Sequence, residues 1–298
     1  MSGTTLLEAR GLRTGYGHLP VVFNVDLEVK EGEIVALLGA NGAGKTTTLR
    51  ALSGMLPLMA GDVCLDGRSL KGSPPDAIAR GGIVHVPQGR GIFPSLRVDE
   101  TLRLACAMAG IRRAEADARV ADMYTVFERL HERRTQLVGT LSGGEQQMLA
   151  IARGLIMKPR LLMIDEMSQG LAPAIVQGLF SIVRSLPEQG VSVLIVEQFV
   201  THALAVATRA YVLEKGEVAF TGKADVLARD EAFVKGSYLG EGGDGATELC
   251  IDDTADLPLH ADGLLETIEA RAAEEGRNAT EVLLDLLREA IDGKGGAS

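Results

Sequence analysis

Three short runs of apolar residues stand out along the first 200 positions of the chain. They are "EIVALL" at 33–38, "RLLMID" at 160–165 and "VSVLIVE" at 191–197. Each run has the length of a strand and is bounded by polar or glycine-containing segments, which favours a buried β-strand. The first run passes through three glycines into "KTTTLRAL", where we expect a helix.

Beyond residue 248 the apolar positions follow the spacing of a helix. A first apolar stripe, ended by Gly276, consists of Leu264, Leu265, Ile268 and Ala272. Asn278 and Glu281 form the cap of a second predicted helix, whose stripe consists of Val282, Leu283, Leu286, Leu287 and Ile291. The segment "LPLH" before them predicts a short strand, so this region is expected to contain one strand and two helices.

The charge of the chain changes at the same place as the hydrophobic pattern. A length of 298 residues allows one or two domains. Residues 241–298 contain 15 Asp and Glu against 4 Lys and Arg, a net charge of −11, whereas residues 1–240 carry +1. Between them "LGEGGDGATE" has the composition of a flexible linker. We therefore predict a domain at 1–240, a linker at 241–247 and an extension at 248–298.

Several classes of protein are excluded by the sequence. No apolar run approaches the roughly 18 to 20 residues that span a bilayer, and "MSGTTLLEARGL" lacks the layout of a secretory signal. The three cysteines, Cys64, Cys106 and Cys250, are far apart and have no metal-type spacing. We expect them to be incidental thiols in a reducing compartment.

The segment "GANGAGKT" predicts a phosphate-binding loop between the first strand and its helix. Gly39, Gly44, Lys45 and Thr46 fit the G-x-x-x-x-G-K-[ST] pattern. Glycines let backbone N–H groups surround phosphate oxygens, Lys45 supplies a charge for the β- and γ-phosphates, and the Thr46 hydroxyl can bind Mg²⁺. The residues expected to contact the nucleotide here are Gly39, Asn41, Gly42, Ala43, Gly44, Lys45, Thr46 and Thr47.

Two carboxylates, Asp165 and Glu166, follow the second apolar run. Acids at the end of a buried strand are costly unless they have a role. Asp165 is expected to hold Mg²⁺ through water, and Glu166 to polarise the attacking water. The alternative is a pair of helix-capping acids after a core strand.

A second anion site is predicted in "LSGGEQQ". Ser142 and Glu145 are spaced as a capping box that opens a helix. A plain cap requires neither Gly143 nor Gly144, and bare glycines at a helix start leave N–H groups free for an anion.

With these motifs the sequence resembles an ATP-binding cassette (ABC) transporter ATPase subunit over residues 5–240, and "LSGGEQQ" matches that family's signature. The resemblance implies an α/β P-loop fold with a parallel-sheet core, a small antiparallel subdomain and a helical signature subdomain. Tyr16 matches the aromatic that stacks on adenine, although it also fits a half-buried strand position. Gln88 matches the glutamine that contacts Mg²⁺ and the water. "SQGLAP" matches the segment that crosses the dimer interface.

The resemblance also implies partners. Two ATPase subunits close head to tail, and Ser142 and Gly144 would serve the γ-phosphate bound to the other subunit. The expected partners are membrane permeases, a second, non-identical ATPase and, indirectly, an extracytoplasmic solute-binding protein. The chain is then expected at the cytoplasmic side of the cell membrane, as a peripheral ATPase with ATP and Mg²⁺.

The stretch "VSVLIVEQFVTHAL" determines which residue meets the γ-phosphate. In the family that residue comes one step after the strand, which selects Gln198 over His202, one helical turn further on. A glutamine can donate a hydrogen bond to phosphate but carries no charge. "VEQ", "GLAP" and "YVLEKGEV" resemble the second ATPase subunit of branched-chain amino-acid importers, while "VPQGRGIFP" favours the related urea and short-chain amide importers.

The extension resembles a ribbon-helix-helix unit. About 45 residues is too short for an independent core, so we expect self-association through 248–292 or docking on a partner, with helices packed on the cassette as the alternative. Nucleic acid is not expected as a partner because the extension carries −11 and phosphates would repel it. A soluble, ATP-gated regulator acting through this extension is the alternative to transport.

Overall fold

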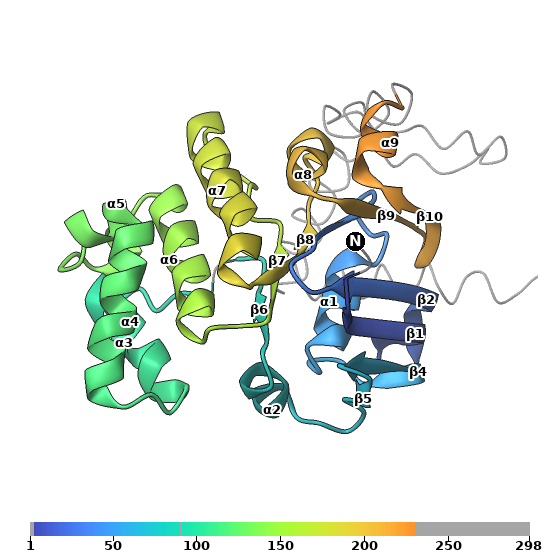
Figure 1. Ribbon diagram of the computed structural model, residues 1–298, viewed down its shortest axis with the longest axis horizontal. Helices are drawn as coiled ribbons and strands as arrows, with labels where there is room; N and C mark the ends of the chain where they lie inside the picture. Colours follow the sequence, from blue (N-terminus) through green and yellow to red (C-terminus); the bar gives the residue numbers. More distant parts are fainter. Residues whose placement is uncertain (1–2, 90, 231–298) are drawn as a thin grey trace, which may run out of the picture. The chain divides into compact units, whose positions relative to one another are not determined.

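The computed structural model describes residues 3–89 and 91–230 (Figure 1). The predictions for the linker at 241–247 and the extension at 248–298 lie outside these residues. In the described part the chain folds into two sheets and a group of helices.

The central sheet has six strands in the order β10-β9-β3-β8-β7-β6. Neighbours from β9 to β6 pair in parallel, and β10 joins β9 antiparallel at one edge. The strands are β3 (Ile34–Leu38), β6 (Ile83–Val86), β7 (Leu161–Asp165), β8 (Ser192–Val196), β9 (Arg209–Glu214) and β10 (Glu217–Lys223). Every residue of β3, β7 and β8 is buried, as expected for central parallel strands with both faces covered. The three strands predicted from the apolar runs are confirmed.

Helix α1 (Lys45–Leu52) follows β3, α7 (Pro173–Ser185) follows β7 and α8 (Val200–Val206) follows β8. Helix α2 (Pro75–Arg80) precedes β6, α9 (Ala224–Ala228) follows the antiparallel strand β10, and a 3₁₀ turn lies at Pro187–Gln189. Because β3, β7 and β8 run in the same direction, the loops that leave their carboxyl ends meet at one edge of the sheet. This edge is where the predicted phosphate loop, Asp165–Glu166 and Gln198 begin.

The second sheet is antiparallel, with the order β2-β1-β4-β5. Its strands are β1 (Thr5–Tyr16), β2 (Leu19–Lys30), β4 (Leu58–Leu65) and β5 (Arg68–Ser69). Residues of β1 and β2 share one hydrophobic cluster with β3 and α1. The antiparallel sheet therefore supports the strand and the helix on either side of the phosphate loop.

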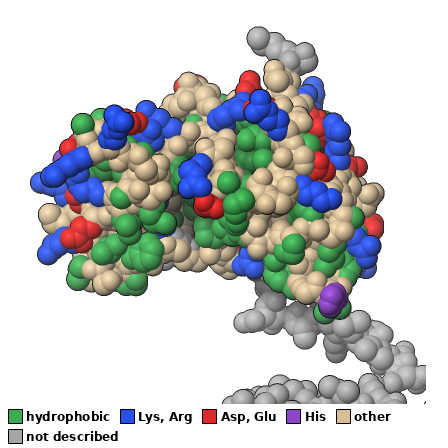
Figure 2. Space-filling view, turned by 90° about the horizontal axis from the view of Figure 1, so that it is seen from below, with side chains coloured by type: hydrophobic (Ala, Val, Ile, Leu, Met, Phe, Trp, Pro, Cys, Tyr) green, Lys and Arg blue, Asp and Glu red, His purple; other side chains and the backbone are tan. Residues whose placement is uncertain are grey.

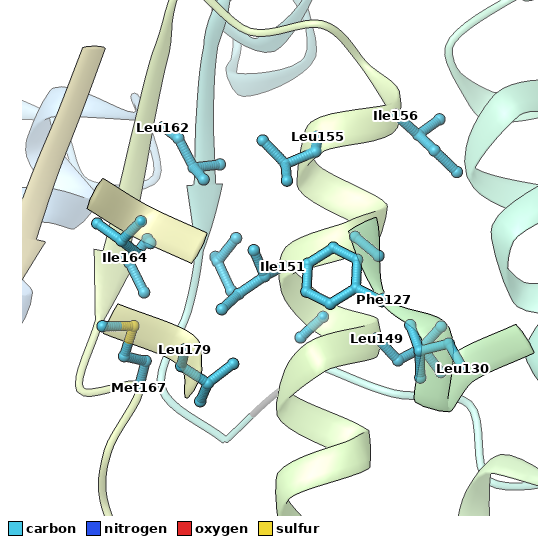
Figure 3. Packing of buried hydrophobic residues seen from close by; sticks show 14 of the residues in the cluster. Phe127, Leu130, Leu149, Ile151, Leu155, Ile156, Leu162, Ile164, Met167 and Leu179 are labelled. Atoms are coloured by element: carbon cyan, nitrogen blue, oxygen red, sulfur yellow. The ribbon is translucent and has the colours of Figure 1, made fainter. Parts of the chain in front are cut away.

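The remaining helices form a third part beside β6 and β7 (Figure 1). They are α3 (Val98–Met108), α4 (Arg113–Val126), α5 (Glu128–Glu132) and α6 (Gly143–Ile156), with a 3₁₀ turn at Val138–Thr140. In Figure 3 Leu149 and Ile151 of α6 lie among the apolar side chains that join α5 to β7 and α7. Parallel core, antiparallel sheet and helical part together confirm the predicted fold class.

Met167 occupies a core position directly after the two carboxylates. It is 1% exposed and belongs to the cluster that includes Leu179 of α7 (Figure 3). The apolar side chain at this position therefore anchors the loop that leaves β7.

Candidate functional site

The loop between β3 and α1 has three glycines with a positive φ, Gly39, Gly42 and Gly44. Gly39 has φ 148°, and a Cβ there would lie 2.3 Å from the carbonyl oxygen of Leu213. Gly44 has φ 104° and directly precedes α1. Both backbone conformations are rarely adopted by other residues. The loop therefore curls tightly onto β9 before α1 begins.

Lys45 lies inside this loop. Its side chain is almost fully buried, and Nζ donates hydrogen bonds to the carbonyl oxygens of Gly39 at 2.8 Å and Ala40 at 3.0 Å. Burial lowers the pKa of the ammonium group, and the nearby carboxylates of Glu166 and Asp165 oppose that shift. The carbonyl oxygens hold the ammonium in place beside the open pocket.

Thr46 and Asp165 bring two oxygen ligands together. The Thr46 hydroxyl donates to Asp165 Oδ1 at 3.2 Å. Asp165 is 1% exposed, and its Oδ2 has no hydrogen-bond partner within the described residues. Burial raises the pKa of this carboxyl group, partly opposed by the Thr46 hydrogen bond. A buried carboxylate oxygen without a partner, next to a hydroxyl, fits a hard cation such as Mg²⁺.

Residues 3–89 and 91–230 contain no group of three His, Cys, Asp or Glu side chains arranged to hold a metal ion. A cation at this site would therefore depend on Thr46, Gln88 and Asp165, together with phosphate oxygens and water. That is the usual way in which Mg²⁺ is bound beside nucleotides.

Glu166 is held by one backbone and one side-chain hydrogen bond. Its backbone has φ 48°, and its N–H donates to the carbonyl oxygen of Val196 at 2.9 Å. Gln88 Nε2 donates to Glu166 Oε2 at 2.6 Å and to Gln169 Oε1 at 3.0 Å. The sequence analysis did not identify Gln169, although it belongs to the quoted "SQGLAP" segment. Its role depends on a contact with a residue 81 positions away.

Lys45, Thr46 and the Glu166 region border one open pocket of about 340 Å³, which Asp165, among the described residues, does not line. It is lined by Val21, Asn41, Gly42, Gly44, Lys45, Thr46, Thr47, Gln88, Glu166 and Gln169. Most of the predicted phosphate-loop residues thus meet Gln88 and Glu166 in space. The side chain of Ala43, also in this loop, is buried.

Tyr16 lies at the end of β1, and 46% of it is exposed. Its hydroxyl accepts a hydrogen bond from Arg50 Nη1 at 2.9 Å, which ties it to α1. In the described part of the chain Tyr16 does not line the phosphate-loop pocket. It is an exposed aromatic ring attached to the helix that follows the phosphate loop.

Ser142 caps α6 as the sequence predicts. Its Oγ accepts from the N–H of Glu145 at 3.3 Å, and its own N–H donates to Glu145 Oε2 at 2.9 Å. Gly144 also has a packing reason to be glycine, because a Cβ there would lie 2.6 Å from Ile175 Cγ2 of α7. Among the described residues, neither these two nor Gly143 line the pocket around Lys45.

Gln198 and His202 have different surroundings. Gln198 is half-buried two residues after the end of β8, and its N–H donates to Glu197 Oε2 at 3.3 Å. The His202 ring stacks on Phe180 of α7 at 5.5 Å between centroids and meets Phe199 edge-on at 6.2 Å. The His202 side chain therefore has a packing role between α7 and α8. Neither residue lines the 340 Å³ pocket in the described structure.

Glu197 was not singled out from the sequence. It is fully buried at the end of β8, and Ser168 donates to it through Oγ at 2.5 Å and through N–H at 3.2 Å. Burial raises the pKa of Glu197 from 4.5 to about 7, although these hydrogen bonds oppose the shift. An acid ending the apolar run "VSVLIVE" was the signal that could have identified it, as it identified Asp165.

Comparisons with known proteins agree with this geometry. Residues 22–169 match the family model described as ABC transporter. The chain is 44% identical to the high-affinity branched-chain amino acid transport ATP-binding protein BraG of Pseudomonas aeruginosa over 229 residues, covering 76% of this chain and 96% of BraG. It is 35% identical to the probable branched-chain amino acid transport ATP-binding protein LivF of Archaeoglobus fulgidus over 231 residues, covering 77% and 97% respectively.

A solved structure of an ATP binding subunit of an ABC transporter has a similar fold. The TM-score is 0.69 at 28% identity, and the match covers 78% of this chain and 98% of that one.

The buried carboxyl group of Glu197 predicts a pH-dependent stability. The unfolded chain releases this proton near pH 4.5 and the folded chain near pH 7, so the folded state binds more protons between these values and loses stability as the pH rises. The free energy of unfolding of Glu197→Gln minus that of the native chain should therefore be roughly 2 kcal/mol higher at pH 8 than at pH 5. Urea denaturation at both pH values measures this difference. A difference that is constant with pH would contradict the raised pKa.

Proposed function

Because the chain belongs to the ABC transporter family of ATP-binding proteins, we propose that it is the ATP-hydrolysing subunit of an importer for branched-chain amino acids. The observation that carries the proposal is the pocket in which the loop around Lys45 meets Gln88 and Glu166. The solute is inferred from BraG and LivF, whose names specify branched-chain amino acid transport.

We propose that the loop N–H groups and Lys45 bind the phosphate oxygens, and that Glu166 orients the attacking water and accepts its proton. The water oxygen bonds to the γ-phosphorus while the bond to the bridging oxygen breaks, which yields ADP and phosphate. Thr46, Gln88 and Asp165 would hold Mg²⁺, which when bound neutralises charge on the β- and γ-phosphates. Asp165 Oδ2, which has no hydrogen-bond partner among residues 3–89 and 91–230, supports this assignment.

The second half of the site is proposed to come from another ATPase subunit. Ser142, Gly143 and Gly144 do not line the described pocket of their own chain, yet α6 begins there with exposed Ser142 and with backbone N–H groups available to an anion. A head-to-tail partner would bring its phosphate loop to this helix start. In the same arrangement Gln198, next to Glu197, would contact the γ-phosphate, and Tyr16 would stack on adenine.

A hydrophobic recess is proposed to bind the permease. It lies between α3, α6 and α2 and has a volume of about 230 Å³. Met55, Phe93 and Met108, which line it, are 51%, 44% and 73% exposed. Figure 2 shows hydrophobic side chains on both sides of a hollow in this face. Such a patch is typical of a protein contact.

The recess and the phosphate pocket are lined by consecutive residues of the chain. Pro87 lines the recess and Gln88 lines the pocket, so a segment bound in the recess can move the residue that contacts Glu166. No helix among the described residues is long and apolar enough to cross a bilayer. The proposed location, peripheral on the cytoplasmic side of the membrane, therefore depends on the permease.

A urea or short-chain amide importer is the alternative within transport, and the names of BraG and LivF favour branched-chain amino acids over it. The alternative function, an ATP-gated regulator, depends on the extension at 248–298, which lies outside the described residues.

The function is tested with the assembled transporter. ATP turnover should rise when the solute-binding protein is loaded with leucine, isoleucine or valine, and should not rise with urea or amides. In this complex Glu166→Gln should lower turnover by roughly 10² to 10⁴, the usual worth of a general base, while ATP binding persists.

The matched control is Glu188→Gln, an exposed glutamate in the 3₁₀ turn after α7, which should turn over ATP like the native chain. Unchanged turnover in Glu166→Gln would remove Glu166 from the mechanism. Stimulation by urea instead would contradict the solute assignment.

The permease surface is tested by a charge in the recess. Met108→Glu should lower co-purification of the permease about tenfold or more, because the carboxylate would have to be desolvated on binding. Val226→Glu, on an apolar residue of α9 that is 57% exposed, is the control. Equal recovery of permease with both variants would place the permease contact elsewhere.

A further inference from the structure

One carboxylate joins the two loops that leave β7 and β8. Glu197 Oε1 accepts from the Ser168 N–H at 3.2 Å, and Oε2 accepts from the Ser168 hydroxyl at 2.5 Å and from the Gln198 N–H at 3.3 Å. Ser168 is 1% exposed and Glu197 is completely buried. The loop after β7 and the loop after β8 are therefore connected by three hydrogen bonds to a single group.

Joining two loops through a buried carboxylate costs free energy. Its desolvation opposes the charged form, and the neighbouring carboxylate of Glu166 adds to that cost. A glutamine of the same shape would avoid the cost, but its amide can accept only through one oxygen. Only the carboxylate can accept from Ser168 and from Gln198 at both oxygens.

The two joined loops carry residues of the phosphate site. Ser168 directly precedes Gln169, which accepts the hydrogen bond from Gln88 and lines the pocket. On the other side Glu197 directly precedes Gln198, the proposed contact of the γ-phosphate. A displacement of Gln198 is therefore transmitted through the carboxylate to Ser168 and Gln169.

We propose that Glu197 is a positioning residue that couples the γ-phosphate contact at Gln198 to the segment 168–172 through Ser168. The inference rests on the proposed function, because it requires a nucleotide in the pocket. When Gln198 contacts phosphate, the Glu197 carboxylate fixes the positions of Ser168 and Gln169 relative to Gln198. Gln88 and Glu166 are then held in the arrangement that hydrolysis requires.

The coupling is tested with two variants that break different halves of the connection. Ser168→Ala removes the hydroxyl donor and leaves the hydrogen bond from the Gln198 N–H to Glu197 in place. Glu197→Gln keeps the shape, but in either orientation its NH₂ group faces one of the two backbone N–H donors. In the assembled transporter with MgATP, each variant should lower kcat about tenfold, the scale of one hydrogen bond to a charged group, with KM for ATP within about threefold.

The double variant is the decisive measurement. If both residues act through one connection, the kcat of Ser168→Ala/Glu197→Gln should lie within about twofold of the slower single variant. The control is Ser192→Ala, which removes a hydroxyl of equal burial at the other end of β8, where it accepts from the Gly32 N–H at 3.0 Å. Its kcat should stay within about twofold of the native value.

Three results would overturn the coupling. They are native kcat in both single variants, a double variant whose losses multiply, and an equal loss in Ser192→Ala. Each of these leaves the proposed function intact, since the transporter with the native chain hydrolyses ATP in all of them. An assembled transporter with the native chain but without ATP turnover would instead contradict the proposed function, and the coupling with it.

Discussion

The ammonium group of Lys45 is held by the carbonyl oxygens of Gly39 and Ala40, in a loop that contains three glycines with a positive φ. A buried charge of this kind is tolerated because hydrogen bonds and the nearby carboxylates of Asp165 and Glu166 compensate its desolvation. Parallel strands make that compensation possible, since β3, β7 and β8 deliver these groups to the same edge of the sheet.

Two surfaces depend on this edge. On one side the pocket around Lys45 is proposed to accept a phosphate chain, and on the other the hydrophobic recess beside α3 is proposed to accept a permease segment. Pro87 and Gln88 belong to one surface each although they are neighbours in the chain. We propose that this short connection links nucleotide hydrolysis to movement in a membrane partner.

The parts of the site that were predictable are those encoded locally. The glycine spacing around Lys45, the acids ending an apolar run and the capping box of Ser142 each lie within a few residues of sequence. Gln169 and Glu197 were missed because their roles depend on contacts with Gln88 and Ser168, 81 and 29 residues away. The fold class followed from the family resemblance, whereas the packing of Gly144 against α7 could be found only in three dimensions.

The central claim is that Lys45, held in its loop, binds the terminal phosphates of a nucleotide. Calorimetric titration of the full-length chain with MgATP and with AMP, for the native chain and for Lys45→Ala, tests it most directly. The account predicts that the native chain prefers MgATP and that Lys45→Ala loses at least about tenfold in affinity for MgATP, on the scale of a hydrogen bond to a charged group, while AMP binding changes little. Equal affinity of both chains for MgATP would contradict it.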